Sequence, residues 1–128
     1  MEALHALFVF YVRDQRASAR FYAAALDAAP TLDVPGMTQF ALPGGATLGL
    51  MPEAGITRLL GDAVDPSRAQ GAARAELYLL VDDVDLAHRR ARAAGARELS
   101  APSARGWGDV AAYALDPDGH VLAFATRP

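Results

Sequence analysis

The chain has 128 residues, of which 12 are basic, all of them arginine, and 15 are acidic; its formal net charge is −3 and it has no cysteine. This length suits one domain, or two small halves that share a core, and is too short for two independent domains. The lack of cysteine excludes disulfides, thiolate metal sites and thiol nucleophiles. The arginines are scattered, which argues against binding of nucleic acid.

Membrane insertion and export are not indicated. No apolar run approaches the roughly 20 residues that span a bilayer. The first residues, MEALHALFVFYVRD, lack the basic start and the small-residue cleavage site of a signal peptide. We therefore expect a cytoplasmic protein without a membrane partner.

The first half of the chain predicts a βαβββ pattern. The β-branched and aromatic run 5–12 indicates a strand, and 15–27 indicates a helix in which Ser18, Tyr22 and Ala25 share one face. Three short strands separated by Pro-Gly turns follow, at 29–34, 37–42 and 46–51.

The second half predicts the same pattern after a linker over 52–74, which has room for one helical turn at 56–60. A strand at 75–81 and a helix at 82–95 come next. Three more strands complete the chain, at 96–101, 109–115 and 120–125.

The two halves also match residue by residue, which indicates an internal repeat. Val12 of VRD corresponds to Val81 of VDD. FALPGGATLGL from Phe40 aligns with YALDPDGHVLAF from Tyr113, with one extra turn residue in the second copy, and we expect both aromatic residues to pack in the core.

This alignment pairs Leu7 with Glu76 and Gly49 with Ala123. Each βαβββ unit is too small to bury both faces of its sheet alone. We therefore expect the two sheets to join into one curved mixed sheet around a cleft.

The sequence resembles the vicinal oxygen chelate superfamily, which includes glyoxalase I, extradiol dioxygenases, fosfomycin resistance enzymes and bleomycin-binding resistance proteins. The resemblance rests on YVRDQRASARFYAAAL, LYLLVDDVD and GWGDVAAYALDPDGHVLAF, and it covers nearly the whole chain. It implies an α+β fold with modules at 1–51 and 75–128 in a single domain over 1–128, and a homodimer.

Catalytic members of this superfamily hold a divalent metal on four inward-facing strand positions, normally His or Glu. The resemblance places these positions at Leu7, Gly49, Glu76 and Ala123, of which only Glu76 has a donor atom. Because a mononuclear site needs about three N or O ligands from the protein, we expect no catalytic metal and no other cofactor. The resemblance is then to the metal-less, bleomycin-resistance-like branch.

The three histidines do not form an evident ligand cluster. His5 either lies at the cleft rim or in solvent, or points to the cleft side of its strand near Glu76. We expect His88 on the solvated face of its helix, and His120 on the strand face opposite Ala123.

The aspartates have structural explanations. Asp14, Asp82 and Asp83 are typical of helix N-caps, and Asp116 and Asp118 of turns. No Ser-His-Asp set is visible, and PGGATLG precedes a strand rather than the helix that a phosphate-binding loop needs.

The predicted ligand-binding residues share the inward faces of the four strands that would hold the metal, apart from Trp107, which lies in a glycine-flanked loop at the cleft mouth. They are Leu7, Val9, Thr47, Gly49, Met51, Glu76, Tyr78, Trp107, Val121 and Ala123.

Three of the polar and aromatic residues at this cleft leave alternatives open. Glu76 either faces a ligand or reaches water at the strand start, and Trp107 either stacks on a ligand or plugs one end of the core. Arg105 either orients an anionic ligand or is a solvated loop residue.

The largely apolar cleft wall predicts a protein that binds a small organic, aromatic or drug-like molecule without catalysis. The alternative is a glyoxalase-like lyase or dioxygenase with a divergent metal site that includes Glu76 and His5. A third possibility is a protein whose dimer surface matters and whose cleft is vestigial.

Overall fold

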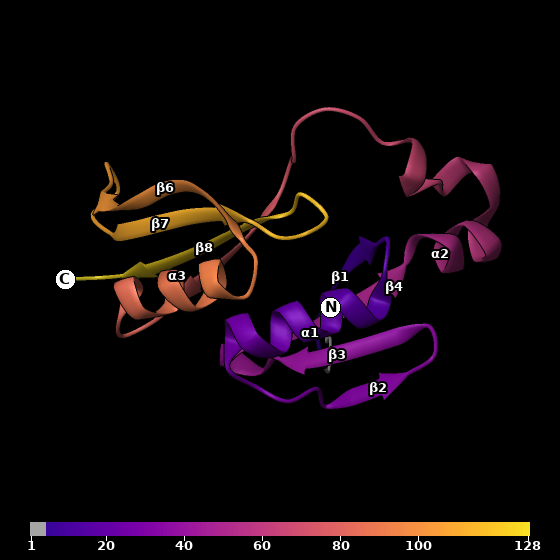
Figure 1. The fold of residues 1–128 in the computed structure, drawn as a ribbon, viewed down its shortest axis with the longest axis horizontal. Helices are drawn as coiled ribbons and strands as arrows, with labels where there is room; N and C mark the ends of the chain where they lie inside the picture. The colour runs from indigo at the N-terminus through magenta and orange to yellow at the C-terminus, as the bar shows by residue number, and fades with distance from the viewer. Residues whose placement is uncertain (1–4) are drawn as a thin grey trace. The chain divides into compact units, whose positions relative to one another are not determined.

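The computed structural model describes residues 5–128, and the chain divides into two compact units. Unit 1 contains Met1–Ala23 and Ala28–Gly71, and unit 2 contains Ala24–Asp27 and Ala72–Pro128. Each unit has its own four-stranded mixed sheet (Figure 1). No helix among residues 5–128 is both long and apolar enough to cross a membrane.

The sheet of unit 1 has the strand order β1-β4-β3-β2. Its strands are β1 (Leu7–Val12), β2 (Leu32–Val34), β3 (Met37–Ala41) and β4 (Thr47–Pro52). The strand β1 runs parallel to β4, and the other pairs are antiparallel. The predicted strands and the predicted first helix are therefore present, although β2 begins three residues later than the sequence pattern indicates.

The helix α1 (Gln15–Leu26) packs on one face of this sheet. The rings of Phe10 in β1 and Tyr22 in α1 lie 6.3 Å apart between centroids, and Phe10 pairs in register with Leu50. Tyr22, Ser18 and Ala25 are all buried, as the helical spacing predicts. We call the opposite face of the sheet the far face of unit 1.

The segment after β4 is more helical than the predicted linker. It forms α2 (Glu53–Leu60) and two short 3-10 turns, Gly61–Val64 and Pro66–Arg68. The helix begins immediately after β4, because Pro52 cannot continue a strand ladder and suits the start of a helix. Ile56 is buried, whereas Leu59 and Leu60 are exposed.

The sheet of unit 2 has the equivalent order β5-β8-β7-β6. Its strands are β5 (Glu76–Leu80), β6 (Arg97–Ala104), β7 (Val110–Leu115) and β8 (Val121–Thr126). The helix α3 (Val84–Ala93) lies against β6, β7 and β8 (Figure 1). We call the face opposite α3 the far face of unit 2.

Strand register confirms the repeat between the two halves. Leu7 pairs with Thr47 across β1 and β4, and the matching residues Glu76 and Val121 pair across β5 and β8. The expected fold class, two tandem βαβββ units with mixed sheets, is confirmed. The joining of the two sheets around one cleft stays a prediction.

The alignment of the two hairpins is wrong by one residue. Gly49 pairs with Gln39, and Ala123 pairs with Tyr113, so the counterpart of Tyr113 is Gln39 and not Phe40. The two hairpin turns have equal length, so the second contains no extra residue. Phe40 is fully buried in the core as expected, whereas Tyr113 is half-buried on the far face of unit 2.

Candidate functional site

The far face of unit 2 has a floor of alanines flanked by two tyrosines. Ala123 is fully buried and pairs with Tyr78 on one side and with Tyr113 on the other. Residues paired in register point to the same side of a sheet, so both rings flank the methyl group of Ala123. Glu76 lies two register positions from Tyr78, beside Val121, and is exposed.

A chain of hydrogen bonds connects this face to the loop before β7. The indole Nε1 of Trp107 donates to the hydroxyl of Tyr78 at 3.0 Å. That hydroxyl donates to Oδ2 of Asp109 at 2.6 Å, and Nε of Arg127 lies 3.5 Å from Oδ1 of the same carboxylate. Asp109 is buried, and a buried carboxylate is costly unless it has partners. The hydroxyl of Tyr78 supplies a hydrogen bond to it, and Arg127 supplies a positive charge.

The turn between β6 and β7 presents Trp107 to solvent. The backbone amide of Arg105 donates to the carbonyl of Asp109 at 2.8 Å. The backbone amide of Gly108 donates to the carbonyl of Arg105 at 3.1 Å. Gly108 has a φ of 101°, a conformation that side chains with a Cβ rarely adopt. Trp107 is 62% exposed, which contradicts the alternative that it plugs the core of the unit.

Arg105 has a structural role that neither sequence-based alternative described. Its guanidinium donates to the carbonyl of Ala111 at 2.8 Å and to the hydroxyl of Ser100 at 2.7 Å. It also lies over the ring of Tyr113, 5.2 Å from the centroid. These contacts hold the β6–β7 hairpin and fix one face of the tyrosine ring.

The electrostatics of this face keep both tyrosines protonated. Burial raises the pKa of Tyr78, and the hydrogen bond to Asp109 raises it further, while the donated bond from Trp107 opposes this. Burial also raises the pKa of Tyr113, and the charge of Glu76 adds to the effect. Both hydroxyls therefore remain neutral hydrogen-bonding groups across the physiological pH range.

The predicted residues of unit 1 also share one face. Leu7, Val9 and Tyr11 of β1 pair in register with Thr47, Gly49 and Met51 of β4 on the far face of unit 1. Leu7 and Val9 are exposed, at 42% and 36%, and Thr47 is buried. This part of the far face is largely apolar, and its role in ligand binding stays a prediction.

The residues at the four metal positions do not fit a metal ion. A Cβ placed on Gly49 would lie 3.1 Å from Sδ of Met37 and 3.3 Å from Cγ2 of Val9, so side chains already fill the space beside it. In unit 2, Ala123 offers only a methyl group, which leaves Glu76 as the single oxygen donor of its pair. A mononuclear site needs about three donors.

His5 and His88 have local partners. Nε2 of His5 lies 2.5 Å from Oγ1 of Thr47, so this imidazole bonds within unit 1. The prediction that His88 is solvated is wrong, because it is only 3% exposed and its Nε2 lies 2.7 Å from Oε2 of Glu98. It faces the sheet because it shares a helix face with the buried Val84 and Ala91.

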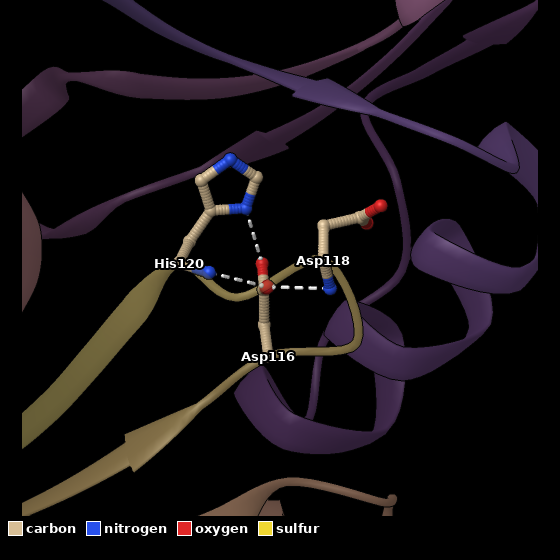
Figure 2. Close-up of side chains that lie close together, drawn as sticks. All are labelled: Asp116, Asp118 and His120. Carbon is tan, nitrogen blue, oxygen red and sulfur yellow. Dashed lines mark hydrogen bonds and ion pairs between the residues drawn. The ribbon is translucent and has the colours of Figure 1, made fainter. Parts of the chain in front are cut away.

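Asp116, Asp118 and His120 in the β7–β8 turn bring potential metal-ligand atoms within 4.8 Å of one another. Figure 2 shows how this cluster is bonded. Oδ1 of Asp116 accepts the backbone amides of Asp118, at 2.9 Å, and His120, at 2.8 Å, and Oδ2 lies 2.8 Å from Nδ1 of His120. Because both oxygens of Asp116 bind the turn itself, we assign this cluster a structural role, and the turn-forming role predicted for Asp116 is confirmed.

Two of the three predicted N-caps are confirmed. Oδ1 of Asp14 accepts the amide of Ala17, and Oδ1 of Asp83 accepts the amide of Leu86, each at 3.0 Å. Asp82 is exposed and is not the N-cap, since α3 begins after Asp83.

Comparison with known proteins identifies the family. The sequence model of the glyoxalase/bleomycin resistance protein/dioxygenase superfamily matches residues 4–124. The chain belongs to this superfamily. The resemblance stated from the sequence is thereby confirmed at the level of the superfamily, and a search of curated proteins gave no match.

Several solved structures have a similar fold. A glyoxalase-related enzyme from Fulvimarina pelagi is 27% identical with a TM-score of 0.83, and the match covers 96% of this chain and 87% of that one. A superfamily enzyme from Burkholderia phytofirmans PsJN is 20% identical with a TM-score of 0.83, over 96% and 98% of the two chains. Protein ATC0852 from Agrobacterium tumefaciens is 26% identical with a TM-score of 0.75, over 99% of both chains.

Sequence reasoning missed Asp109 and Arg127 and misplaced Tyr113. Asp109, Ala111 and Tyr113 are spaced two residues apart, so an extended strand places them on the same face. This spacing could have indicated that Asp109 points to the far face. Arg127 lies near the end of the chain, and its contact with Asp109 follows only from the pairing of β7 with β8.

Proposed function

We propose that this superfamily protein binds a small, planar organic molecule on the far face of unit 2 and uses no catalytic metal. The observation that carries the proposal is the exposed indole of Trp107, held by Tyr78 beside a floor of small side chains. An aromatic surface that is fixed before the ligand arrives loses little conformational entropy on binding. Stacking on such a surface favours the binding of planar ligands.

The composition of the face supports binding more than catalysis. The hydroxyl of Tyr78 already donates to Asp109 and accepts from Trp107, so it is not available to transfer a proton to a substrate. The four positions at which catalytic relatives would hold a metal offer one donor, Glu76. Unit 1 offers a second largely apolar surface for a ligand on its own far face. Its predicted ligand-binding residues are Leu7, Val9, Thr47, Gly49 and Met51.

Ligand binding is tested with the intrinsic fluorescence of Trp107, because the sequence contains one tryptophan. A panel of planar aromatic compounds is screened for quenching, and hits are measured by calorimetry. Trp107→Ala is expected to weaken binding by about 1–2 kcal/mol. Ala123→Phe should abolish it by placing a phenyl group between Tyr78 and Tyr113, at a cost of about 1–3 kcal/mol in stability from overpacking.

The matched control is Ala72→Phe, which adds the same group at an exposed loop position in unit 2 and should leave affinity unchanged. Folding of each variant is checked by circular dichroism. If Trp107→Ala and Ala123→Phe both remain folded and bind like the wild type, the far face of unit 2 is not the ligand site.

The metal-free part of the proposal is tested by elemental analysis of purified protein. We expect far less than one equivalent of any transition metal and an unchanged melting temperature in chelator. Stoichiometric zinc, nickel or iron, with loss of stability in chelator, would instead support the lyase or dioxygenase alternative.

A further inference from the structure

A second candidate binding site lies within unit 1. A groove with a volume of about 780 Å³ opens between the first turns of α1 and the segment that leads into and out of β2. This volume falls within the range of about 300–1,000 Å³ that is common for small-molecule sites. We call it the α1–β2 groove.

The groove is lined by three arginines, Arg13, Arg16 and Arg20, and by two aspartates, Asp14 and Asp33. This local excess of positive charge contrasts with the net charge of −3 of the whole chain. A positive groove on an acidic protein attracts anions selectively, because the rest of the surface repels them.

Two of these arginines have no partner within residues 5–128. Arg16 and Arg20 are exposed and make no hydrogen bond or ion pair with any described residue. They are one helical turn apart on α1, where two like charges repel and destabilise a helix slightly. No described residue forms an ion pair with either guanidinium, whereas a bound anion would.

Within residues 5–128, neither aspartate of the groove forms an ion pair with Arg16 or Arg20. Oδ1 of Asp14 accepts the amide of Ala17 at 3.0 Å, and Oδ1 of Asp33 accepts the hydroxyl of Thr38 at 2.9 Å. The carboxylate of Asp14 thus caps α1, and that of Asp33 connects β2 to β3.

The groove is also preformed. The side-chain amide of Gln15 donates to the carbonyl of Val34 at 2.8 Å and to the hydroxyl of Thr38 at 2.9 Å, and it accepts the amide of Gly36 at 3.0 Å. These bonds fix α1 to the β2–β3 hairpin. A site whose walls are fixed before binding loses less entropy when the ligand arrives.

We propose that the α1–β2 groove binds a phosphate monoester that carries an apolar group. Two guanidinium groups match the two charges of a phosphate monoester, whereas a carboxylate would leave one unbalanced, and the guanidinium fork suits phosphate oxygens. Pro30, Val34 and Pro35 provide the apolar wall for the organic part. This proposal is independent of the ligand proposed for the far face of unit 2.

The test is an NMR titration of isotopically labelled protein with phenyl phosphate, inorganic phosphate, benzoate and phenol. We expect saturable binding of phenyl phosphate, with the largest amide shifts in Gln15–Arg20 and 33–36. Inorganic phosphate and benzoate should bind more weakly, and phenol not at all. Affinity should fall as salt rises, because the contact is between charges.

The double variant Arg16→Gln/Arg20→Gln should weaken phenyl phosphate binding at least tenfold and remain folded, since both side chains are exposed. Arg68→Gln, which removes an exposed arginine of unit 1 outside the groove, should change affinity less than twofold. The proposal is overturned if phenyl phosphate does not saturate, if benzoate or inorganic phosphate binds as tightly, or if Arg68→Gln weakens binding as much as the double variant.

Discussion

Tyr78 connects the buried charge of unit 2 to its exposed aromatic surface. Its hydroxyl donates a hydrogen bond to Asp109 and accepts one from Trp107. Removal of this hydroxyl would leave the buried carboxylate with Arg127 as its remaining side-chain partner, at 3.5 Å. The position of the indole and the stability of the unit should therefore depend on the same oxygen atom.

We predict that Tyr78→Phe lowers the melting temperature by a few degrees and shifts the emission of Trp107 toward that of a freely solvated indole. The matched control is Tyr113→Phe, because the Tyr113 hydroxyl makes no hydrogen bond with any residue among 5–128, although its ring contacts Arg105. Steady-state fluorescence and thermal unfolding measure both effects. An unchanged emission spectrum in Tyr78→Phe would contradict the anchoring role.

The adjacent aspartates before α3 provide a second comparison between single residues. Asp83 caps the helix through the amide of Leu86, whereas Asp82 is exposed and does not cap it. We predict that Asp83→Ala lowers the free energy of unfolding by about 1 kcal/mol, and that Asp82→Ala changes it by much less. Urea denaturation measures both values, and equal effects would show that the cap is not the cause.

At the scale of elements, a polar contact between His88 and Glu98 connects the buried side of α3 to β6. His88 is buried on α3, and Glu98 of β6 lies 2.7 Å from its Nε2 and 3.4 Å from Nη1 of Arg92. The hydrogen bond from His88 lowers the pKa of Glu98, the charge of Arg92 lowers it further, and burial opposes both. The ionised carboxylate thus stabilises the packing of α3 on the sheet.

This contact makes a prediction about pH. Because the pKa of Glu98 is lowered on folding, its contribution is fully present above the ordinary value of 4.5 and is lost as pH falls below it through the lowered pKa. Glu98→Gln should therefore reduce stability at neutral pH and flatten the loss of stability as pH falls below 4.5. The melting temperature measured across this range gives the slope.

Asp82→Asn serves as the control for this titration, because it removes an exposed carboxylate near the same helix. It should retain the acid-dependent slope of the wild type. If Glu98→Gln also retains that slope, the His88–Glu98 contact does not account for the acid sensitivity.

At the scale of the whole molecule, the exposed leucines of α2 are a candidate surface for dimer formation. The apolar segment ITRLL, residues 56–60, lies in this helix, where Ile56 is buried while Leu59 and Leu60 are 69% and 54% exposed. Adjacent exposed leucines on a structured helix are typical of an interface. They support the proposal that the protein forms a homodimer.

We predict a sedimenting mass of about 27 kDa at micromolar concentration, twice the 13.5 kDa of one chain. Leu59→Asp should shift the protein toward monomer, because it would bury a charge in the interface. Arg68→Gln, on the 3-10 turn that follows α2, should leave the mass unchanged. A wild-type protein that sediments as a monomer would exclude this role for α2.

The sequence by itself determined the order of strands and helices, the repeat and the superfamily. Hydrophobic alternation and capping are local signals, and they placed both major helices, α1 and α3, and every strand within a few residues. The sequence also identified Leu7 and Glu76 as equivalent positions of the two repeats, and likewise Gly49 and Ala123, because the repeat preserves strand register.

Only the tertiary structure decided which distant side chains meet. The face of Tyr113 depended on hairpin register, in which an error of one residue moves a side chain to the other side of the sheet. The burial of His88 depended on which face of α3 meets the sheet, and the chain from Trp107 through Tyr78 to Asp109 joins segments about 30 residues apart in sequence. Local propensity carries no information about such contacts, since packing of whole elements brings these residues together.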